Sequence, residues 1–317
     1  MEAASIKWSL HMIAYAPTDR LAVVCCHFNP QRYSTKSANF AAFLAPLAAA
    51  GIPTFVVECA FGEAAFELED AIQIRGRDVM WQKERLLNIA ISRVPESIPN
   101  IAWLDADVLF TNSNWAVDCV EALKRFAVVQ SFDRAIRLPR GIATEDGTGQ
   151  AYSGFAAVSA AHPQRLLTGD FAAHGHTGFA WAARREVLRH GLYDACIAGS
   201  GDHMMAHAFC GDWQSRCIER IIGANPAHAT HFAEWSRGVY RDVRAKVGAV
   251  PGTVLHLWHG ETADRRYVDR NRELAAHGFD PVTDVRVGPT GCWEWSSDKP
   301  ALHRWARQYF GSRNEDG

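Results

Sequence analysis

The chain has 317 residues, of which 48% are hydrophobic and 21% charged, and its formal net charge is −2. These values are typical of a globular protein with a sizeable core, and the near-zero charge excludes a chain whose overall field attracts a polyanion. The eight cysteines form no C-x-x-C pair, which favours reduced thiols in a cytoplasmic protein over a disulfide framework or a zinc ribbon. No apolar run approaches the roughly 18 residues of a membrane span, so we expect a soluble protein with no membrane partner.

Apolar and amphipathic segments alternate along the first third of the chain. The run LAVVCCHF suits a strand that is buried on both faces, and Gly51 would end the helix that follows it. Such alternation predicts an α/β fold with a mostly parallel, Rossmann-like sheet and helices on both faces. The elements expected here are strands at 21–28, 52–60, 71–74 and 101–110 and helices at 37–50 and 81–94.

The segment 133–176 differs from this pattern, because it is rich in Gly, Thr, Ala and Arg and has little periodicity. We expect it to form a long loop or a mobile lid, since long loops inside compact domains often have functional roles. Regular structure should resume after it. The elements expected there are strands at 177–183 and 254–260 and helices at 184–191 and from 201 onward.

A carboxylate pair, Asp105 and Asp107, lies inside the apolar run 101–110. Residues two apart point to the same side of a strand, so both could face one ligand if the backbone stays extended. The carboxyl edge of a parallel sheet is where such folds bind ligands, and carboxylates with substrate phosphates hold Mg²⁺ or Mn²⁺. A D-x-D pair also arises by chance and caps turns. Flanking apolar residues favour the functional interpretation, because buried carboxylates are costly unless they bind something.

Two further segments contain candidate site residues. Asp202 follows three small residues at an expected helix start, where it could serve as a base for an acceptor hydroxyl or, taken alone, simply cap the helix. His256 and His259 lie in the last expected strand, and one of them could complete a metal site with Asp107. Zinc is not favoured there, because no cysteine or further ligand lies at a regular spacing.

The order of these motifs resembles that of GT-A glycosyltransferases, especially the β-galactosyltransferase and polypeptide N-acetylgalactosaminyltransferase type, from Leu21 to about Arg270. That family has a polar, Asn-containing turn after its first strand, a helix with a basic residue and an Asn, a D-x-D metal motif, a glycine-containing strand and an acidic base motif. The matching segments are Cys26-His27-Phe28-Asn29-Pro30, Lys83–Asn88, Asp105-Ala106-Asp107, Thr177-Gly178-Phe179 and Gly201-Asp202-His203. The base motif departs from the family, because one acid of its usual pair is replaced.

The resemblance implies a metal-dependent transfer of a sugar from a nucleoside diphosphate sugar, with UDP favoured, to a hydroxyl acceptor. It implies Mn²⁺ or Mg²⁺ bound by Asp107 and by His259 or His256, and Asp202 as the base of an inverting single displacement. Retention stays open, as do the sugar and the acceptor. The residues that it assigns to the nucleotide sugar are His27, Asn29, Glu58, Lys83, Asn88, Asp105 and Gly178.

The resemblance also divides the chain into five parts. Their roles are an N-terminal extension, a nucleotide-sugar-binding half, a lid, an acceptor and catalytic half, and a C-terminal extension rich in Arg and Trp. In that order they cover residues 1–20, 21–132, 133–176, 177–260 and 261–317.

Basic residues near the expected site can be interpreted in two ways. The favoured interpretation is a solvated helix face paired with neighbouring acids. The alternative is phosphate contacts, because the spacing of W-H-G followed by R-R-Y resembles that of phage and bacterial transferases associated with hydroxymethylated pyrimidine in DNA. The basic residues are Arg237, Arg241, Arg244, Lys246, Arg265, Arg266, Arg270 and Arg272.

Two functions besides sugar transfer are compatible with paired acids on an α/β sheet. One is a metal-dependent nucleotidyltransferase, and the other is an inactive module that binds a sugar nucleotide. The lack of a glycine in the turn after the first strand counts against the nucleotidyltransferase, which usually needs a Gly-rich phosphate loop there. The missing second acid beside Asp202 keeps the inactive module open.

Overall fold

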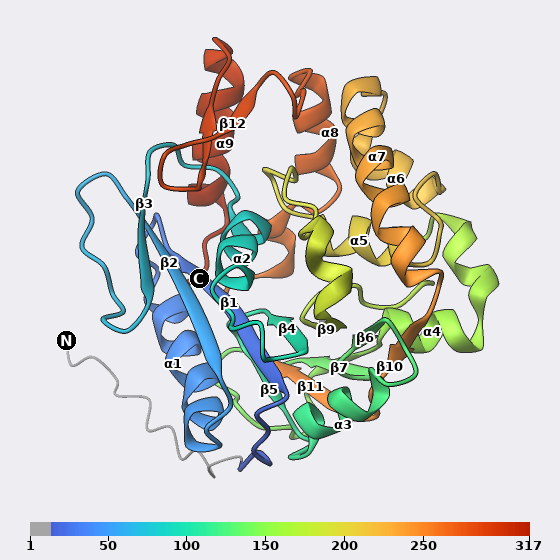
Figure 1. The fold of residues 1–317 in the computed structure, drawn as a ribbon. Helices are drawn as coiled ribbons and strands as arrows, with labels where there is room; N and C mark the ends of the chain where they lie inside the picture. The colour runs from blue at the N-terminus through green and yellow to red at the C-terminus, as the bar shows by residue number, and fades with distance from the viewer. Residues whose placement is uncertain (1–13) are drawn as a thin grey trace.

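A seven-stranded sheet lies at the centre of the computed structural model, which describes residues 14–317 (Figure 1). All of its strands run in one direction except β9, which is antiparallel to both of its neighbours. The expected mostly parallel sheet is therefore confirmed. In spatial order the strands are β10 (Val247–Ala249), β6 (Val128–Gln130), β9 (Ala180–Arg184), β4 (Asn100–Leu104), β1 (Leu21–Phe28), β2 (Thr54–Phe61) and β3 (Ile72–Gly76).

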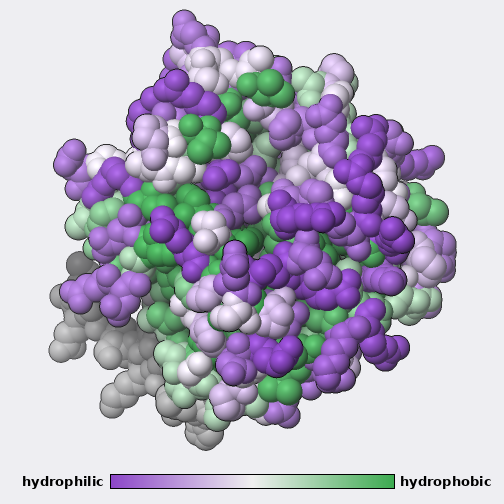
Figure 2. Space-filling view, in the orientation of Figure 1, coloured by the Kyte–Doolittle hydropathy of each residue, from purple (hydrophilic) through white to green (hydrophobic). Residues whose placement is uncertain are grey.

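The two faces of this sheet bury two separate cores, as the alternation of side chains along a strand requires. On β1, Val23 packs in one core with Phe43 of helix α1 (Ser34–Ala49), whereas Val24 packs in the other with Leu87 of helix α2 (Lys83–Ile91). The prediction of helices on both faces is thus confirmed. Most of the molecular face seen in Figure 2 is hydrophilic, with apolar side chains gathered in smaller groups.

Local capping explains where several helices begin and end. The Ser215 side chain accepts a hydrogen bond from the backbone of Ile218, and Asn225 does the same for His228, so both residues act as N-caps. Gly51, at a φ of +64°, follows α1 in the left-handed region that favours glycine. The other α-helices are α3 (Trp115–Ala122), α4 (Phe155–Ala161), α5 (Gly201–Phe209), α6 (Arg216–Ile222), α7 (Pro226–Val243), α8 (Asp269–Ala276) and α9 (Pro300–Ser312).

A second sheet corrects the prediction for segment 133–176. This segment was expected to be irregular, but it contains two strands, α4 and a short 3₁₀ helix, η1 (Pro163–Thr168). Its strands are short. Arg134–Arg137 pairs with Thr253–His256, more than a hundred residues later, and Gln150–Ser153 pairs with Arg134–Arg137, so the local sequence contains little periodicity that could indicate them. The sheet has the order β5 (Val108–Phe110), β11 (Thr253–His256), β7 (Arg134–Arg137) and β8 (Gln150–Ser153).

The remaining elements lie outside the two larger sheets. Strands β12 (Val285–Val287) and β13 (Trp293–Trp295) pair with each other, and the segment expected as a helix at 184–191 is the 3₁₀ helix η2 (Arg185–His190). Of the expected extension 1–20, residues 1–13 lie outside the described part, whereas Tyr15 packs against Trp115. Within residues 14–317, no helix combines the length and the apolar character that crossing a membrane requires.

Candidate active site and metal centre

A cavity of about 630 Å³ lies at the carboxyl ends of β1 and β4, the edge at which parallel sheets bind ligands. Its volume is in the range of small-molecule sites. Segments far apart in the sequence meet around it, including the turn after β4, the start of α5, the end of β11 and the segment 262–271. The lining residues discussed below are His27, Lys83, Glu84, Asp105, Asp107, Arg137, His174, His176, Gly178, Asp202, His203, His256, His259, Arg265, Arg270 and Arg313.

The D-x-D segment forms a turn, which corrects the expectation of an extended strand. Strand β4 ends at Leu104, and β5 begins only at Val108. The Asp105 backbone N–H donates to the Phe179 carbonyl at 2.7 Å, and its carboxylate accepts from the Phe179 N–H at 3.2 Å. Because the chain turns here, the carboxylates of Asp105 and Asp107 have different partners while lining one cavity.

Asp107, His256 and His259 form a group that we call the aspartate cluster. Strand β11 is antiparallel to β5 and places His256 opposite Val108, which brings the histidine beside Asp107. Asp107 Oδ2 lies 2.9 Å from His259 Nε2, and the Nε2 atoms of the two histidines lie 3.1 Å apart. One ligand atom from each residue falls within 4.8 Å of the others. The structure therefore brings together the three residues that the sequence associates with a metal.

The donor atoms of the aspartate cluster fit a divalent cation. Asp107 Oδ1 is buried and finds no hydrogen-bond partner among the described residues, which is costly for a carboxylate oxygen unless a cation binds it. Burial lowers the pKa of His256 far below its usual value, so the ring is in the neutral form that coordinates metals. Burial alone would raise the pKa of Asp107, but the facing His259 and His256 lower it, so the carboxylate is ionised.

Residues to which sequence reasoning gave no role at the metal surround the aspartate cluster. Glu315 lies almost at the end of the chain, and its Oε1 atom is 3.7 Å from His259 Nδ1, where a carboxylate can orient the ring. Arg265 donates to the His259 carbonyl at 2.9 Å and contacts its ring at 2.8 Å. Glu315 also pairs with Arg313. Nothing in the local sequence of the tail indicated that it reaches the cavity.

Lys83 joins two further carboxylates of the cavity, those of Asp105 and Asp202. Its ammonium group forms a salt bridge with Asp105 and lies 2.6 Å from Asp202 Oδ2. Burial raises the pKa of Asp105 to about 6, and Lys83 opposes that rise. The helix-cap interpretation of Asp202 is wrong, because Ser200 occupies the N-cap position of α5 and Asp202 lies in the first turn. The Asp202 carboxylate thus lines the cavity, where it contacts the Lys83 ammonium group.

Close packing between α2 and α5 positions Asp202. A Cβ atom at Gly201 would lie 2.5 Å from Glu84 Oε1, so only glycine lets the start of α5 approach this buried side chain. Burial raises the pKa of Glu84 to about 8, so the group is protonated at neutral pH. Because Glu84 is neutral, it lies next to Lys83 without competing with Asp105 and Asp202 for the ammonium group.

The basic residues of segment 262–272 do not all lie on a solvated helix face, contrary to the favoured interpretation. Arg265 and Arg270 are 9% and 4% exposed and line the cavity. Arg266 and Arg272 do pair with acids at the surface, as expected. Together with Arg137, the two buried arginines give the cavity the positive charge that an anionic ligand requires.

Three residues assigned to the nucleotide sugar lie outside the cavity lining. Asn29 closes a turn by bonding the backbone of Tyr33 through both of its side-chain atoms. Both oxygens of Glu58 accept backbone N–H groups of the 67–68 segment, at 2.7 and 2.9 Å. The Asn88 amide bonds the backbone of Leu192. These side chains are occupied in holding loops, so we do not retain their assignment.

Two other assigned residues do line the cavity. His27 is buried, and its Nε2 atom lies 3.1 Å from Glu67 Oε2. Gly178 lies against His176, whose ring a Cβ at this position would meet at 3.3 Å. His176 itself was not anticipated; its ring stacks on Phe179 with a centroid distance of 3.8 Å, and Arg137 Nη2 lies 3.1 Å from its Nε2 atom.

Comparison with known proteins gives distant structural likeness only. No family model and no curated protein matches the sequence. The fold is similar to the crystal structure of the catalytic domain of Drosophila beta1,4-galactosyltransferase 7 in complex with xylobiose, with 11% identity, coverage of 90% of this chain and 98% of that one, and a TM-score of 0.41. It is also similar to mannosyl-3-phosphoglycerate synthase from Rubrobacter xylanophilus, with 13% identity, 87% of each chain covered and a TM-score of 0.39. Glucosyl-3-phosphoglycerate synthase from Mycobacterium tuberculosis, in complex with Mn²⁺, UDP and phosphoglyceric acid, has 12% identity, coverage of 88% and 87%, and a TM-score of 0.38.

Proposed function

We propose that the protein is a metal-dependent glycosyltransferase that moves a sugar from a nucleoside diphosphate sugar, UDP-linked in the first instance, to a hydroxyl acceptor. The observation that carries this proposal is the unpartnered Asp107 Oδ1 atom in the aspartate cluster, facing a cavity that also contains Asp202 and buried arginines. A cation site, a carboxylate base and positive charge are the three components that transfer from a diphosphate donor requires.

Asp107, His256 and His259 would hold the cation. When bound, it neutralises the charge that develops on the departing diphosphate. Two imidazoles and one carboxylate suit Mn²⁺ better than Mg²⁺, which prefers oxygen ligands. The buried arginines Arg265 and Arg270 would bind the phosphates, with Arg265 directly beside the cation site because it contacts His259.

Asp202 would act as the base of an inverting displacement. Its carboxylate accepts the proton of the acceptor hydroxyl, the acceptor oxygen forms a bond to the anomeric carbon, and the bond from that carbon to the diphosphate oxygen breaks. The diphosphate leaves with the electron pair. Lys83, 2.6 Å from Asp202, holds the carboxylate in place before the acceptor binds. The 133–176 segment, whose residues 151–153 and 171–176 line the cavity, would exclude water from the donor.

Donor binding provides the first test, because it does not require the acceptor. Thermal shift with Mn²⁺ and UDP-glucose, UDP-galactose or GDP-mannose should show stabilisation by one donor, and release of the nucleoside diphosphate should accompany it. Asp107→Ala should abolish the metal-dependent shift. Glu121→Ala, which removes an exposed carboxylate of α3 that pairs with Lys124, is the matched control and should retain it. The absence of a shift with every donor in the unmodified protein would refute the proposal.

A further inference from the structure

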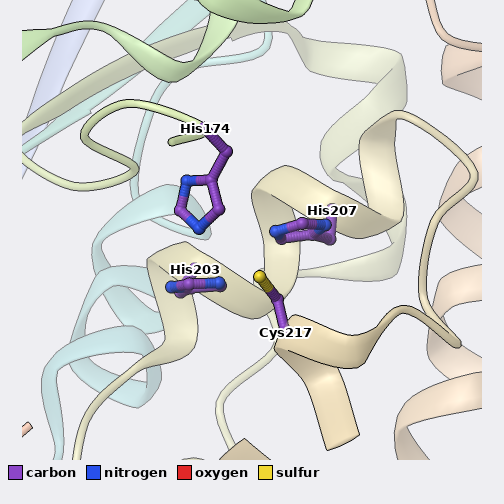
Figure 3. Close-up of side chains that lie close together, drawn as sticks. All are labelled: His174, His203, His207 and Cys217. Carbon is purple, nitrogen blue, oxygen red and sulfur yellow. The ribbon is translucent and has the colours of Figure 1, made fainter. Parts of the chain in front are cut away.

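Three histidines and a cysteine meet beside the cavity, outside the aspartate cluster. His174, His203, His207 and Cys217, which we call the cysteine cluster, each offer a ligand atom within 4.8 Å of the others (Figure 3). His203 and His207 lie one turn apart on α5, Cys217 lies on α6, and His174 precedes Gly175 in the segment after η1. Figure 3 shows the Cys217 thiol near the α5 pair, with the His174 ring approaching from the opposite side.

The far nitrogens of two rings are already bound by protein acceptors. His207 Nδ1 lies 2.8 Å from Asp212 Oδ2 and 3.4 Å from the Ser215 hydroxyl. His174 Nδ1 lies 2.8 Å from the Gly175 carbonyl. An Nδ1–H that donates to a carboxylate or a carbonyl leaves the lone pair on Nε2, and this is the arrangement found behind metal-binding histidines.

The inward-facing atoms have no protein partner. The Nε2 atoms of His174, His203 and His207 are buried and make no hydrogen bond to any residue within 14–317. The His174, His207 and Cys217 side chains are at most 1% exposed. Buried nitrogens without a partner are rare and costly.

Packing of core histidines explains only part of this arrangement. His203 and His207 stack with centroids 5.0 Å apart, and Phe171 and Phe155 pack against the same rings. Ring stacking accounts for those contacts. It does not account for three unpaired nitrogens that surround one thiol, since a purely structural cluster would satisfy them with polar neighbours.

We propose that the cysteine cluster binds a zinc ion through three imidazole Nε2 atoms and the Cys217 thiolate. Zinc prefers tetrahedral N and S ligands at about 2.0–2.1 and 2.3 Å, so ligand atoms of a loaded site lie roughly 3.3–3.6 Å apart. Small side-chain movements close the present group to that size. The thiol proton leaves to solvent when zinc binds. Four protein ligands fill the coordination shell, which makes the site a structural one.

The ion would fix the wall of the catalytic cavity. His203 directly follows Asp202, and His174 lies two residues before His176. One zinc ion therefore ties α5, α6 and the 171–176 segment together behind both residues. Its role is to position Asp202 and to hold the 171–176 segment against the cavity.

Zinc content measured by elemental mass spectrometry tests the proposal, with the full chain purified without metal-affinity resin. We expect about one zinc per chain, and the same value in the Asp107→Ala/His259→Ala double variant, which removes the competing aspartate cluster. Cys217→Ala should lose the zinc. Cys210→Ala, which changes another cysteine near the end of α5, should retain it. Zinc that remains in Cys217→Ala would overturn the proposal, as would an unmodified protein without zinc.

Cobalt provides a second measurement that does not depend on a variant folding. Protein produced in cobalt-supplemented medium should show a thiolate-to-cobalt charge-transfer band and the visible absorption of a tetrahedral ion. The band should persist in Cys210→Ser and vanish in Cys217→Ser. A cobalt protein without the thiolate band would overturn the proposal. Neither measurement requires a sugar donor, so this proposal can fail while the glycosyltransferase proposal holds, and the reverse.

Discussion

The aspartate cluster and the cysteine cluster both contribute residues to the lining of one cavity, yet their chemistry differs. The aspartate cluster has three ligand atoms, includes a carboxylate and faces a cavity of about 630 Å³. The cysteine cluster has four, includes a thiol and packs against Phe155 and Phe171, while its His174 and His203 also line the cavity. An incomplete set of ligands at a cavity leaves positions for substrate oxygens, whereas a complete set leaves none. The comparison suggests an exchangeable catalytic ion in the first cluster and a resident structural ion in the second.

The largest expected difference between the clusters is their response to a chelator. Brief treatment with EDTA should stop nucleoside diphosphate release completely, because an ion with substrate-accessible positions exchanges readily, and Mn²⁺ should restore it. Zinc measured in the same sample should remain at about one per chain. Loss of zinc in parallel with activity would show that the two clusters are not functionally distinct.

Replacing Asp202 tests catalysis separately from ion binding by either cluster, although Asp202 is next to His203 in the sequence. Asp202→Asn should lower the transfer rate by about 10²–10⁴-fold, because the amide cannot accept the proton. Mn²⁺-dependent donor binding and zinc content should both stay unchanged. Asp269→Asn, a change in the first turn of α8, is the matched control and should leave the rate intact. Transfer at the parent rate by the Asp202 variant would rule out its role as base.

Asp212 tests whether a residue that contacts a member of the cysteine cluster strengthens its affinity for zinc. Its carboxylate bonds His207 Nδ1 at 2.8 Å, so Asp212→Asn should weaken zinc affinity by about 10–100-fold while all four ligands remain. Competition with a chromogenic chelator measures this change. Donor binding by the aspartate cluster should not change. Unaltered zinc affinity would indicate that the Asp212 contact has only a packing role.

The smallest expected effect concerns Glu84, which lies under the start of α5. Its pKa is raised by burial from 4.5 to about 8, so the folded state favours the protonated form. The stability that this provides is complete below pH 4.5 and is lost as pH rises toward 8. Glu84→Gln, which stays neutral, should flatten that decline in the free energy of unfolding, measured with denaturant across this range. Equal slopes for both proteins would contradict the expectation.

The sheet could be predicted from sequence because its strands are buried on both faces. LAVVCCHF and the run before Asp105 are continuous apolar segments, and burial alone decides their structure. Strand β7 could not be predicted from local pattern, since it pairs with β11 far along the chain, and β8 pairs in turn with β7. The turn at Asp105–Asp107 was missed for a similar reason, because it forms where the chain leaves the first sheet after β4 and enters the second sheet as β5.

The candidate site likewise contains some residues that sequence motifs indicate and others that only the tertiary structure brings together. Asp107, His256 and His259 were found by the order of motifs, whereas the burial of Arg265 and Arg270 depends on tertiary packing that no charge pattern reveals. The cysteine cluster had one local signal, two histidines four residues apart on α5, which places both on one helix face. Cys217 and His174 come from separate segments, so their spacing indicated nothing.

The last residues of the chain complete the cavity wall. Glu315 lies against His259, and Asp316 accepts hydrogen bonds from the backbone at the start of α1. A truncated protein that ends with α9 at Ser312 would keep every helix and strand and most of the buried core. It would lose the carboxylate behind His259, however, so expression boundaries chosen from secondary structure alone would cut into the proposed metal centre.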